Sequence, residues 1–577
     1  MSIDATVQKE IRKIVLRNAV EYGGNARYDV VISKVVGLRP DLRPTIKQQI
    51  PLIKKIVDEV NSLDHAEQQR MASKLLVFED TRGKRSEEPS LPPLQGAIMG
   101  KVITRFPPEP NGYPHIGHAK AAIIDQEYAR IYRGKLILRF DDTNPLNEQL
   151  EFYNAIKEGL EWLGIEPDLV KNTSDDIELL QSYGKEMVMK GDAYVCTCRP
   201  ENIHMMRAKG VNCPCRGRNS GEYLTQLEKF FDGSFEQNEA IIRFRGDMSD
   251  LNTAMRDPTL FRIIDADHPK LGRRIREFPT YDFAAPIEDS LDGVTHAMRT
   301  KEYELRNELY FSVLRSLGLR NPLLLEFSRL EFEGMPVSKR KLKPLIEGGL
   351  VSGWDDPRLP TLAGLRKKGI LPEAIHKFVI SLGISLADTR PPFEALESYN
   401  RKFLDLISLR LFFVKNPMEI RISNPIFNKV VLKNHPTQQQ LGTRSVQTSD
   451  RIYIDKEDAD QLERGEEIRL MEMHNIQLDE VIQGNSSKYL RVTNTGTEIK
   501  PNIPKVQWVS NDDMIPFTVI VPGKLFLGNE FNKDSLHVYN GVSESYVSKV
   551  RAASSIQFVR FGFCRLQTDG VAIYTHG

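Results

Sequence analysis

Residues 114–118 read Pro-His-Ile-Gly-His and stand between a predicted strand and the first turn of a predicted helix. A helix N-terminus presents unpaired N–H groups and the positive end of the helix dipole, and it therefore favours phosphate. Gly117 has no Cβ, so a flat base or ribose can lie against its backbone, and the imidazoles of His115 and His118 can donate hydrogen bonds to phosphate oxygens. The alternative is a pair of surface histidines that cap a helix, and the motif alone does not decide between the two.

A second, basic motif follows much further along the chain. Residues 328–330 read Ser-Arg-Leu, and residues 334–341 read Gly-Met-Pro-Val-Ser-Lys-Arg-Lys. Lysine and arginine in a glycine-containing loop are suited to closing over a polyphosphate as negative charge shifts in a transition state. Taken alone, the same residues are more typical of a solvated basic turn.

Four cysteines form two close pairs, Cys196 with Cys198 and Cys213 with Cys215. Two such pairs can supply four thiolates to a closed tetrahedral zinc site, with His204 as a spare ligand. The alternative is four reduced cysteines in an ordinary segment. The fifth cysteine, Cys564, stands in an alternating strand and is predicted to lie in the core.

The elements around the first motif predict how it is positioned. Residues 102–106 form a short apolar strand, 107–114 a turn-rich loop, 118–132 a helix with one apolar face, and 135–140 the next strand. Strand, loop, helix and strand in this order predict an α/β fold with a parallel, doubly wound, Rossmann-like sheet. Ligands of such a sheet lie beyond the carboxyl ends of its strands.

The rest of the chain divides by composition and periodicity. We expect an N-terminal helical unit at 1–80, a charged and proline-rich linker at 81–100, the two halves of the parallel-sheet domain at 101–194 and 276–348, an insertion with the cysteines at 195–275, a helical domain at 349–417, and antiparallel β-barrels at 418–577.

Charge and composition narrow the class of protein. The 577 residues include 79 Lys and Arg against 78 Asp and Glu, so the net charge is +1 and a nucleic acid would have to be held by local patches. Clustered cysteines do not form the framework of a secreted disulfide protein, and a reducing cytosol fits them better. The N-terminus lacks the apolar stretch of a signal peptide, and no long apolar run is present. We therefore expect a cytoplasmic protein without a membrane span.

Together, the histidine motif at 114–118 and the basic motif at 328–341 resemble the HIGH and KMSKS motifs of class I aminoacyl-tRNA synthetases, in the same order. Val337 stands where KMSKS has Met, and this change leaves Ser338 and Lys339 in place. Residues 1–80 resemble the N-terminal unit of archaeal glutamyl-tRNA synthetases. Further segments resemble the glutamyl/glutaminyl subfamily: 105–112, 139–145, 255–258, 281–283, 353–358, 434–436 and 451–455.

The resemblance implies a two-step reaction. Glutamate and ATP would give glutamyl-adenylate and pyrophosphate, and the terminal adenosine 2′-OH of tRNA(Glu) would then take the acyl group. No protein nucleophile is required, and Mg²⁺ would be shared by the ATP phosphates. The resemblance assigns catalysis to His115, His118, Ser338 and Lys339, and ATP binding to Pro108, Glu109, Asn111, Gly117, Arg329, Leu330 and Lys339.

The resemblance also places Arg105, Asp141, Tyr281 and Arg299 around the amino acid, with Asp141 as partner of its ammonium group. Glutaminyl enzymes usually carry a small uncharged residue in place of Arg299. An arginine fork can pair with a γ-carboxylate, whereas a side-chain amide would turn an NH₂ group toward it. Leu305 stands where glutaminyl enzymes have an Asp, so glutamate is favoured over glutamine.

Bacterial glutamyl-tRNA synthetases have a similar zinc knuckle in the insertion that meets the tRNA acceptor end, and the resemblance implies that the barrels read the anticodon. Four loose candidates for anticodon contacts are Arg421, Arg444, Tyr453 and Trp508. The resemblance leaves open whether tRNA(Gln) is also charged, and we expect a monomer. The alternatives are a glutaminyl-tRNA synthetase, a non-catalytic synthetase-like RNA-binding protein, and a nucleotidylyltransferase.

Overall fold

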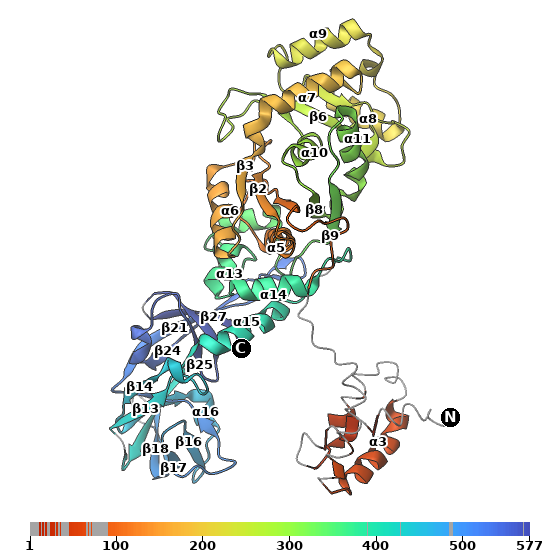
Figure 1. Ribbon diagram of the computed structural model, residues 1–577. Coiled ribbons are helices and arrows are strands. Elements are labelled where there is room, and N and C mark those ends of the chain that lie inside the picture. Colours follow the sequence, from red (N-terminus) through yellow and green to blue (C-terminus); the bar gives the residue numbers. More distant parts are fainter. Residues whose placement is uncertain are drawn as a thin grey trace. The chain divides into compact units, whose positions relative to one another are not determined.

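The computed structural model describes residues 90–577 apart from 389, 427, 484–487 and 569. Of the first 89 residues, it describes 11–12, 14–16, 18–19, 24–28, 30–32, 35, 46–64, 67–68 and 71. The chain forms two compact units, Met1–Glu88 and Pro89–Gly577 (Figure 1).

The N-terminal unit has a small apolar core on one side of helix α3 (Ile46–Asn61). Ile53, Val57 and Val60 follow one another at spacings of four and three residues, so they share one face of the helix and are buried there. The end of the predicted helical unit, 72–80, and the first part of the predicted linker, 81–89, lie outside the described residues.

Residues 90–100, which the composition assigns to a linker, pack against the parallel-sheet domain. Leu91 and Leu94 are buried in its core. The hydroxyl of Tyr128 donates to the carbonyl of Pro92 at 2.9 Å, and the backbone N–H of Leu94 donates to the hydroxyl of Tyr132 at 2.9 Å. Two leucines in a proline-rich stretch are enough to bring it into the domain, because each buries its side chain against existing apolar surface.

The predicted parallel sheet is confirmed. Strands β1 (Ile103–Phe106), β2 (Lys135–Phe140) and β3 (Leu169–Asn172) pair in parallel, and so do β8 (His296–Thr300) and β9 (Leu323–Phe327). Backbone N–H of Thr295 donates to the carbonyl of Ile103 at 2.9 Å, which places β8 beside β1. Helices α5 (Ile116–Ile131) and α6 (Leu150–Trp162) follow β1 and β2 (Figure 1). A Cβ at Gly134 would lie 2.0 Å from the carbonyl oxygen of Val102, so glycine is needed where β2 approaches β1.

The insertion is built on an antiparallel sheet of four strands, in the order β4 (Ala193–Cys196), β5 (Ile241–Phe244), β6 (Thr259–Ile263) and β7 (Glu277–Pro279). Strand β4 begins just before the predicted limit of 195, and β7 lies just after the predicted limit of 275. Helices α8 (Pro200–Lys209) and α9 (Ser220–Phe231) belong to the insertion, α7 (Ile177–Lys190) precedes it, and α10 (Tyr281–Leu291) and α11 (Asn307–Leu317) follow it. Phe261 of β6 packs with Phe283 of α10 and Leu309 of α11 in one core, so the insertion and the second half of the parallel-sheet domain are joined.

Four helices lead to the C-terminal region: α12 (Lys339–Glu347), α13 (Leu362–Lys368), α14 (Pro372–Leu382) and α15 (Phe393–Ile407). Thr361 caps α13 by accepting a hydrogen bond from the N–H of Gly364 at 3.0 Å, and Pro372 stands in the first turn of α14. Among the described residues, no helix is long and apolar enough to cross a membrane.

Two seven-stranded sheets form the C-terminal region. We call proximal the sheet that consists, in spatial order, of β10 (Leu409–Leu411), β25 (Ser555–Phe558), β26 (Gly562–Leu566), β27 (Val571–His576), β21 (Met514–Pro522), β24 (Leu536–Glu544) and β11 (Phe413–Val414). The distal sheet consists of β19 (Lys505–Val506), β16 (Glu467–Leu470), β17 (Asn475–Gln483), β18 (Lys488–Gly496), β12 (Pro417–Ser423), β15 (Arg451–Asp455) and β20 (Val509–Ser510).

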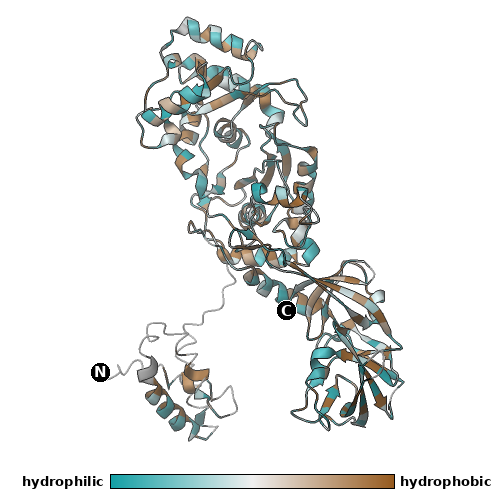
Figure 2. Cartoon of the chain, turned by 180° about the vertical axis from the view of Figure 1, so that it is seen from behind, coloured by the Kyte–Doolittle hydropathy of each residue, from teal (hydrophilic) through white to brown (hydrophobic). Residues whose placement is uncertain are grey.

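The predicted C-terminal β-barrels are confirmed as two barrel-like sheets in which most strand pairs are antiparallel, but not all of them are. Strand pairs β10–β25, β12–β18, β16–β19 and β21–β27 are parallel. Alternation along a strand reports its buried face but not the direction of its neighbour, so the sequence could not separate the two arrangements. Figure 2 shows hydrophilic and hydrophobic residues interspersed along these strands, which is the pattern that the sequence does predict.

Candidate active site

The two histidines of residues 114–118 form one unit at the start of α5. The backbone N–H of Gly117 donates to Nδ1 of His115 at 3.1 Å, and the N–H of His115 donates to Nδ1 of His118 at 3.2 Å. Both Nδ1 atoms are thus acceptors, which leaves each Nε2 as an N–H donor. Burial, together with the nearby Arg329 cation, lowers the pKa of His118 to about 4, and burial also lowers that of His115. The two rings therefore act as neutral donors near pH 7.

Gly117 allows a close approach that any other residue would block. A Cβ at this position would lie 2.9 Å from Cε1 of His115 and 3.4 Å from the carbonyl oxygen of Leu330. The glycine therefore brings the first turn of α5 against Leu330, in the first part of the second motif.

Lys339 begins α12, and Ser338 stands at the N-cap position of that helix. The Lys339 ammonium donates to the carbonyl of Asn111 and lies 5.2 Å from the centre of the Phe152 ring. Burial, and then repulsion by Lys343, lower the pKa of Lys339. The loop is therefore folded against the histidine motif.

One cavity of about 480 Å³ joins the two motifs. Eight of the residues predicted for catalysis or ATP binding line it: Asn111, His115, Gly117, His118, Arg329, Leu330, Ser338 and Lys339. Pro108 and Glu109 are not part of this lining, but the backbone N–H of Asp141 donates to the carbonyl of Pro108 at 3.0 Å. Arg329 points a mostly exposed guanidinium at Glu302, 2.8 Å away.

The cavity also has a lysine that the sequence analysis missed. Lys120 of α5 is 2% exposed, and its ammonium donates to the carbonyl of Ser328 at 2.5 Å and to its hydroxyl at 3.2 Å. Burial lowers its pKa to about 8. Its position on the apolar face of the predicted helix is a signal that could have singled it out.

The four residues predicted around the amino acid lie near one another and are largely buried. Arg105, Arg299 and Asp141 all contribute electrostatically to the pKa of Tyr281, which burial raises. Nη2 of Arg105, Nε of Arg299 and Oδ1 of Asp141 are buried and have no hydrogen-bond partner among the described residues. Tyr303 accepts from Arg299 through its carbonyl at 3.3 Å and lines the cavity, so the cluster lies next to it.

Burial dominates the titration of Asp141. It raises the pKa of that carboxyl to about 7, although the Arg139 cation opposes this effect; the neighbouring Glu109 adds to it. A carboxylate oxygen that is buried and unpaired is costly for the free protein and is suited to a cationic partner.

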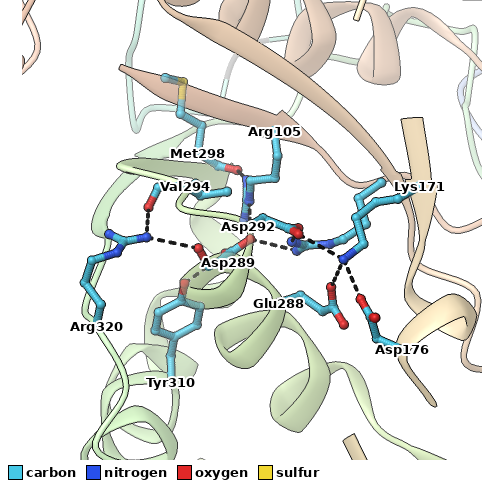
Figure 3. A network of polar contacts seen from close by, with 11 residues as sticks. Arg105, Lys171, Asp176, Glu288, Asp289, Asp292, Val294, Met298, Tyr310 and Arg320 are labelled. Carbon is cyan, nitrogen blue, oxygen red and sulfur yellow. Dashed lines mark hydrogen bonds and ion pairs between the residues drawn. The ribbon is translucent and has the colours of Figure 1, made fainter. Parts of the chain in front are cut away.

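Behind Arg105 lies a buried network of charged groups (Figure 3). Asp289 is its centre: its Oδ1 accepts from Nε of Arg105 at 2.9 Å and from Arg139 at 2.7 Å, and its Oδ2 accepts from the Tyr310 hydroxyl at 2.8 Å. Burial alone would raise the pKa of Asp289, but the two guanidinium groups hold it below its usual value. The carbonyl of Met298 takes another donor of Arg105, at 2.6 Å.

Lys171 closes the other side of this network in Figure 3. Its ammonium donates to Glu288 at 2.7 Å, to Asp292 at 2.9 Å and to Asp176 at 2.5 Å. Sequence reasoning did not single out these acids. Glu288 and Asp289 occupy buried positions on α10, and consecutive acids in an otherwise apolar helix are the signal that was available.

The four cysteines come together in the insertion. Their Sγ atoms all lie within 4.8 Å of one another, with separations of 3.4 Å between Cys196 and Cys213, 3.3 Å between Cys198 and Cys213, and 3.7 Å between Cys198 and Cys215. His204 is exposed on α8 and does not belong to this group. Thiolates at about 2.3 Å from a tetrahedral zinc ion lie roughly 3.8 Å apart, so the cluster fits such an ion.

Two of the four anticodon candidates are core residues. Trp508 is 1% exposed and donates to the carbonyl of Met471 at 2.9 Å, and buried Arg444 donates to Glu544 at 2.8 Å. Neither can stack on a base, so these two predictions are wrong.

The other two anticodon candidates, Arg421 and Tyr453, are at least partly accessible to solvent, whereas Cys564 lies in the core and Leu305 lies at the surface. Arg421 is exposed and lies 3.9 Å from the centre of the Tyr489 ring, and Tyr453 is half-buried. Cys564 is fully buried, as predicted, and Leu305 is 66% exposed.

Comparison with known proteins fits this geometry. The family described as "tRNA synthetases class I (E and Q), catalytic domain" matches residues 101–406, and families described as "tRNA synthetases class I (E and Q), anti-codon binding domain" match 408–494 and 505–567.

Full-length relatives carry one name. A protein of Cenarchaeum symbiosum named glutamate–tRNA ligase is 48% identical over 98% of this chain and 99% of its own length. Proteins of the same name from Nitrosopumilus maritimus and Pyrococcus abyssi are 47% and 38% identical, over 100% and 99% of this chain and 100% of their own length. The chain belongs to the glutamyl/glutaminyl family of class I aminoacyl-tRNA synthetases.

Proposed function

We propose that this protein is a glutamate–tRNA ligase, which activates L-glutamate with ATP and transfers it to the 3′-terminal adenosine of tRNA(Glu). One observation carries the proposal: Arg105 and Arg299 each keep an unpaired buried N–H, and Asp141 keeps an unpaired buried oxygen. Two donors and one acceptor complement the γ-carboxylate and the ammonium of glutamate. The names of the relatives support the same substrate.

In the first step, an α-carboxylate oxygen of glutamate attacks the α-phosphorus of ATP, and pyrophosphate leaves with the electrons of the broken P–O bond. His115 and His118 would donate hydrogen bonds from their Nε2–H groups to phosphate oxygens, while Ser338 and Lys339 hold the departing group. The protein contributes by positioning and by stabilising negative charge, since the substrate supplies the nucleophile.

In the second step, the 2′-OH of the terminal adenosine attacks the carbonyl carbon of the adenylate, the bond between that carbon and the phosphate oxygen breaks, and AMP leaves with the bonding electrons and takes up the hydroxyl proton. The negative charge of Glu109 contributes to the raised pKa of Asp141. By similarity, Glu109 faces the nucleotide or the acceptor end. The insertion would hold the acceptor end, and the C-terminal sheets would hold the anticodon.

Two metals belong to the proposal. Zinc would be bound by Cys196, Cys198, Cys213 and Cys215, where it would stiffen the insertion. Mg²⁺ would be carried by the ATP phosphates and would neutralise part of their charge. In the described lining of the cavity, the carboxylates of Glu302 and Glu331 both lie within ion-pair distance of an arginine, so ATP itself is the better ligand.

Finer parts of the proposal concern partners and location. We propose a monomer, because one chain brings the predicted site residues together. A cytoplasmic location suits four reduced cysteines at one site. Charging of tRNA(Gln) in addition to tRNA(Glu) is a proposal that only an assay can test.

The test is aminoacylation of tRNA(Glu) and tRNA(Gln) with glutamate and with glutamine. Glutamate transfer to tRNA(Glu) is the expected result. Preferential glutamine transfer would favour a glutaminyl enzyme, and tRNA binding without transfer of either amino acid would favour a non-catalytic RNA-binding protein. Activation without any tRNA acceptor would favour a nucleotidylyltransferase.

A further inference from the structure

A second cavity, of about 420 Å³, lies at the junction between the parallel-sheet domain and the proximal sheet. Its lining includes Tyr113, Trp162, Arg366 and Arg565, from the histidine-motif loop, α6, α13 and β26. The two sides of the junction touch directly, because the Thr575 hydroxyl donates to the carbonyl of Lys368 at 2.7 Å. Gly369 marks the same close approach, since a Cβ there would lie 2.5 Å from the Thr575 hydroxyl oxygen.

The two arginines of this cavity stand out because neither has a direct partner; Arg366 is exposed and Arg565 is half-buried. Arg366 lies in the last turn of α13, and Arg565 lies on β26. Neither guanidinium has a hydrogen bond or ion pair with any described residue. Lys367, their neighbour in the lining, pairs with Asp355 at 2.8 Å. Glu158 also lines the cavity but is paired with neither arginine.

Two cations in one partly enclosed space are unfavourable unless an anion joins them. Arg366 and Arg565 line the same cavity, and burial, followed by the charge of Arg366, lowers the pKa of Arg565. A guanidinium offers a planar fork of donors that matches the oxygens of a phosphate. The cavity therefore has the chemistry of a phosphate site.

The position of the cavity indicates which phosphate-bearing molecule would bind there. A tRNA that places its acceptor end in the nucleotide cavity and its anticodon on the C-terminal sheets has to pass the junction between these two regions. Its backbone carries one phosphodiester per nucleotide. We propose that Arg366 and Arg565 together bind a backbone phosphate of the tRNA at this junction, an inference that rests on the proposed function. A free phosphate compound is the other source of the same chemistry.

The test measures binding of tRNA(Glu) to the full chain by filter retention over a series of salt concentrations, for Arg366→Gln, Arg565→Gln and the double variant. Each single variant should bind roughly tenfold more weakly. The slope of log K against log salt should become less steep by about one. Because both arginines hold the same phosphate, the double variant should lose about one unit of slope rather than two.

Two further variants serve as controls. Arg366→Lys keeps a cation at the site and should keep most of the slope. Arg130→Gln removes an arginine that is already paired with Glu127 at 2.6 Å, and it should bind as the parent does. Thermal unfolding of every variant checks folding, and removal of one of two repelling cations should not lower the unfolding temperature.

A parent-like salt slope in both folded Gln variants would overturn the proposal. A second arm distinguishes the source of the phosphate: if inorganic phosphate or ATP stabilises the parent, but not the Gln variants, and their tRNA binding is unchanged, the site belongs to a free phosphate compound and the proposal is wrong. Failure of the proposed function looks different, because the parent itself would then bind or glutamylate no tRNA.

Discussion

Nε of Arg105 lies 2.9 Å from Oδ1 of Asp289, and both side chains are completely buried. The Nη1 group of Arg105 donates to the carbonyl of Met298, so the protein itself uses the Nε and Nη1 donors of the guanidinium. The Nη2 group is left, and it has no partner among the described residues. The orientation of the remaining donor is thus determined by a carboxylate that need not touch the substrate.

We predict that Asp289→Asn raises the KM for glutamate much more than the KM for ATP. An amide oxygen has no charge to hold Arg105 and Arg139, and losing one partner of a buried ion pair costs about 3–5 kcal/mol. Steady-state kinetics with each substrate and urea unfolding are the measurements. Tyr310→Phe is the gentler companion, because it removes only the 2.8 Å hydrogen bond to Oδ2. Equal changes in both KM values would indicate general loss of structure instead.

Lys339→Ala should slow adenylate formation by roughly 10²–10³-fold, with little change in glutamate binding, because a charge used in the transition state affects rate more than affinity. ATP–pyrophosphate exchange in the presence of tRNA measures this step. Lys341→Ala, in the same helix but exposed, is the matched control. Parent-like exchange by the Lys339 variant would remove this lysine from the mechanism.

Replacement of Arg299 by Ala or Cys should abolish most glutamate activity while raising the relative acceptance of glutamine. The γ-carboxylate loses its cationic partner, and the donors that disfavour an amide are removed at the same time. Arg105 and Tyr281 remain, so absolute glutamine activity should stay poor. The ratio of kcat/KM for glutamate to that for glutamine, with a fixed tRNA, is the measurement. A ratio that does not move would make Arg299 a structural residue.

The pH dependence of glutamate use should follow Asp141. Its pKa is about 7 in the free protein, and only the ionised form can pair with the substrate ammonium. As pH falls below 7, kcat/KM for glutamate should fall by about tenfold per unit. His118 does not account for such a change, because its pKa is about 4. Asp141→Asn should be less active and flat over this range; a variant that keeps the parental pH profile would contradict the assignment.

Metal analysis should find about one zinc per chain in protein purified without added zinc. Cys215→Ser should lose that metal and loosen the insertion, whereas Cys564→Ser, in the proximal sheet, should retain it. Chelation of the parent should weaken tRNA charging more than glutamate activation, since the cluster lies in the insertion. Metal-free protein with full charging activity would leave the cluster as four reduced thiols.

The sequence predicted the motifs well because each depends on local chemistry. His115, Gly117 and His118 mark a helix start, and the cavity that contains them also contains Lys339. What the sequence could not give is the use of each donor. Arg105 was predicted to face the amino acid, but its Nε and Nη1 groups donate to Asp289 and Met298, and Nη2 is the group left without a partner among the described residues.

Which residues of the C-terminal sheets are buried could not be predicted from the sequence either. Trp508 and Arg444 stand in alternating segments, and alternation leaves open which face of a strand is covered. Both are in the core because a second layer packs on them: Phe412 lies 5.9 Å from Trp508, ring to ring, and Glu544 neutralises Arg444. Lys120 was overlooked for the converse reason, since its partner, the carbonyl of Ser328, is distant in sequence.

The order of strands in the proximal sheet has a consequence for biosynthesis. Strands β10 and β11 are made first, the whole distal sheet follows, and β27, from residues 571–576, then takes the central place between β26 and β21. Until the ribosome has synthesised residues 571–576, β21 and β26 each lack a neighbouring strand and expose unpaired edges. The distal sheet can mature before residues 571–576 have left the ribosome, whereas the proximal sheet cannot be completed until they have.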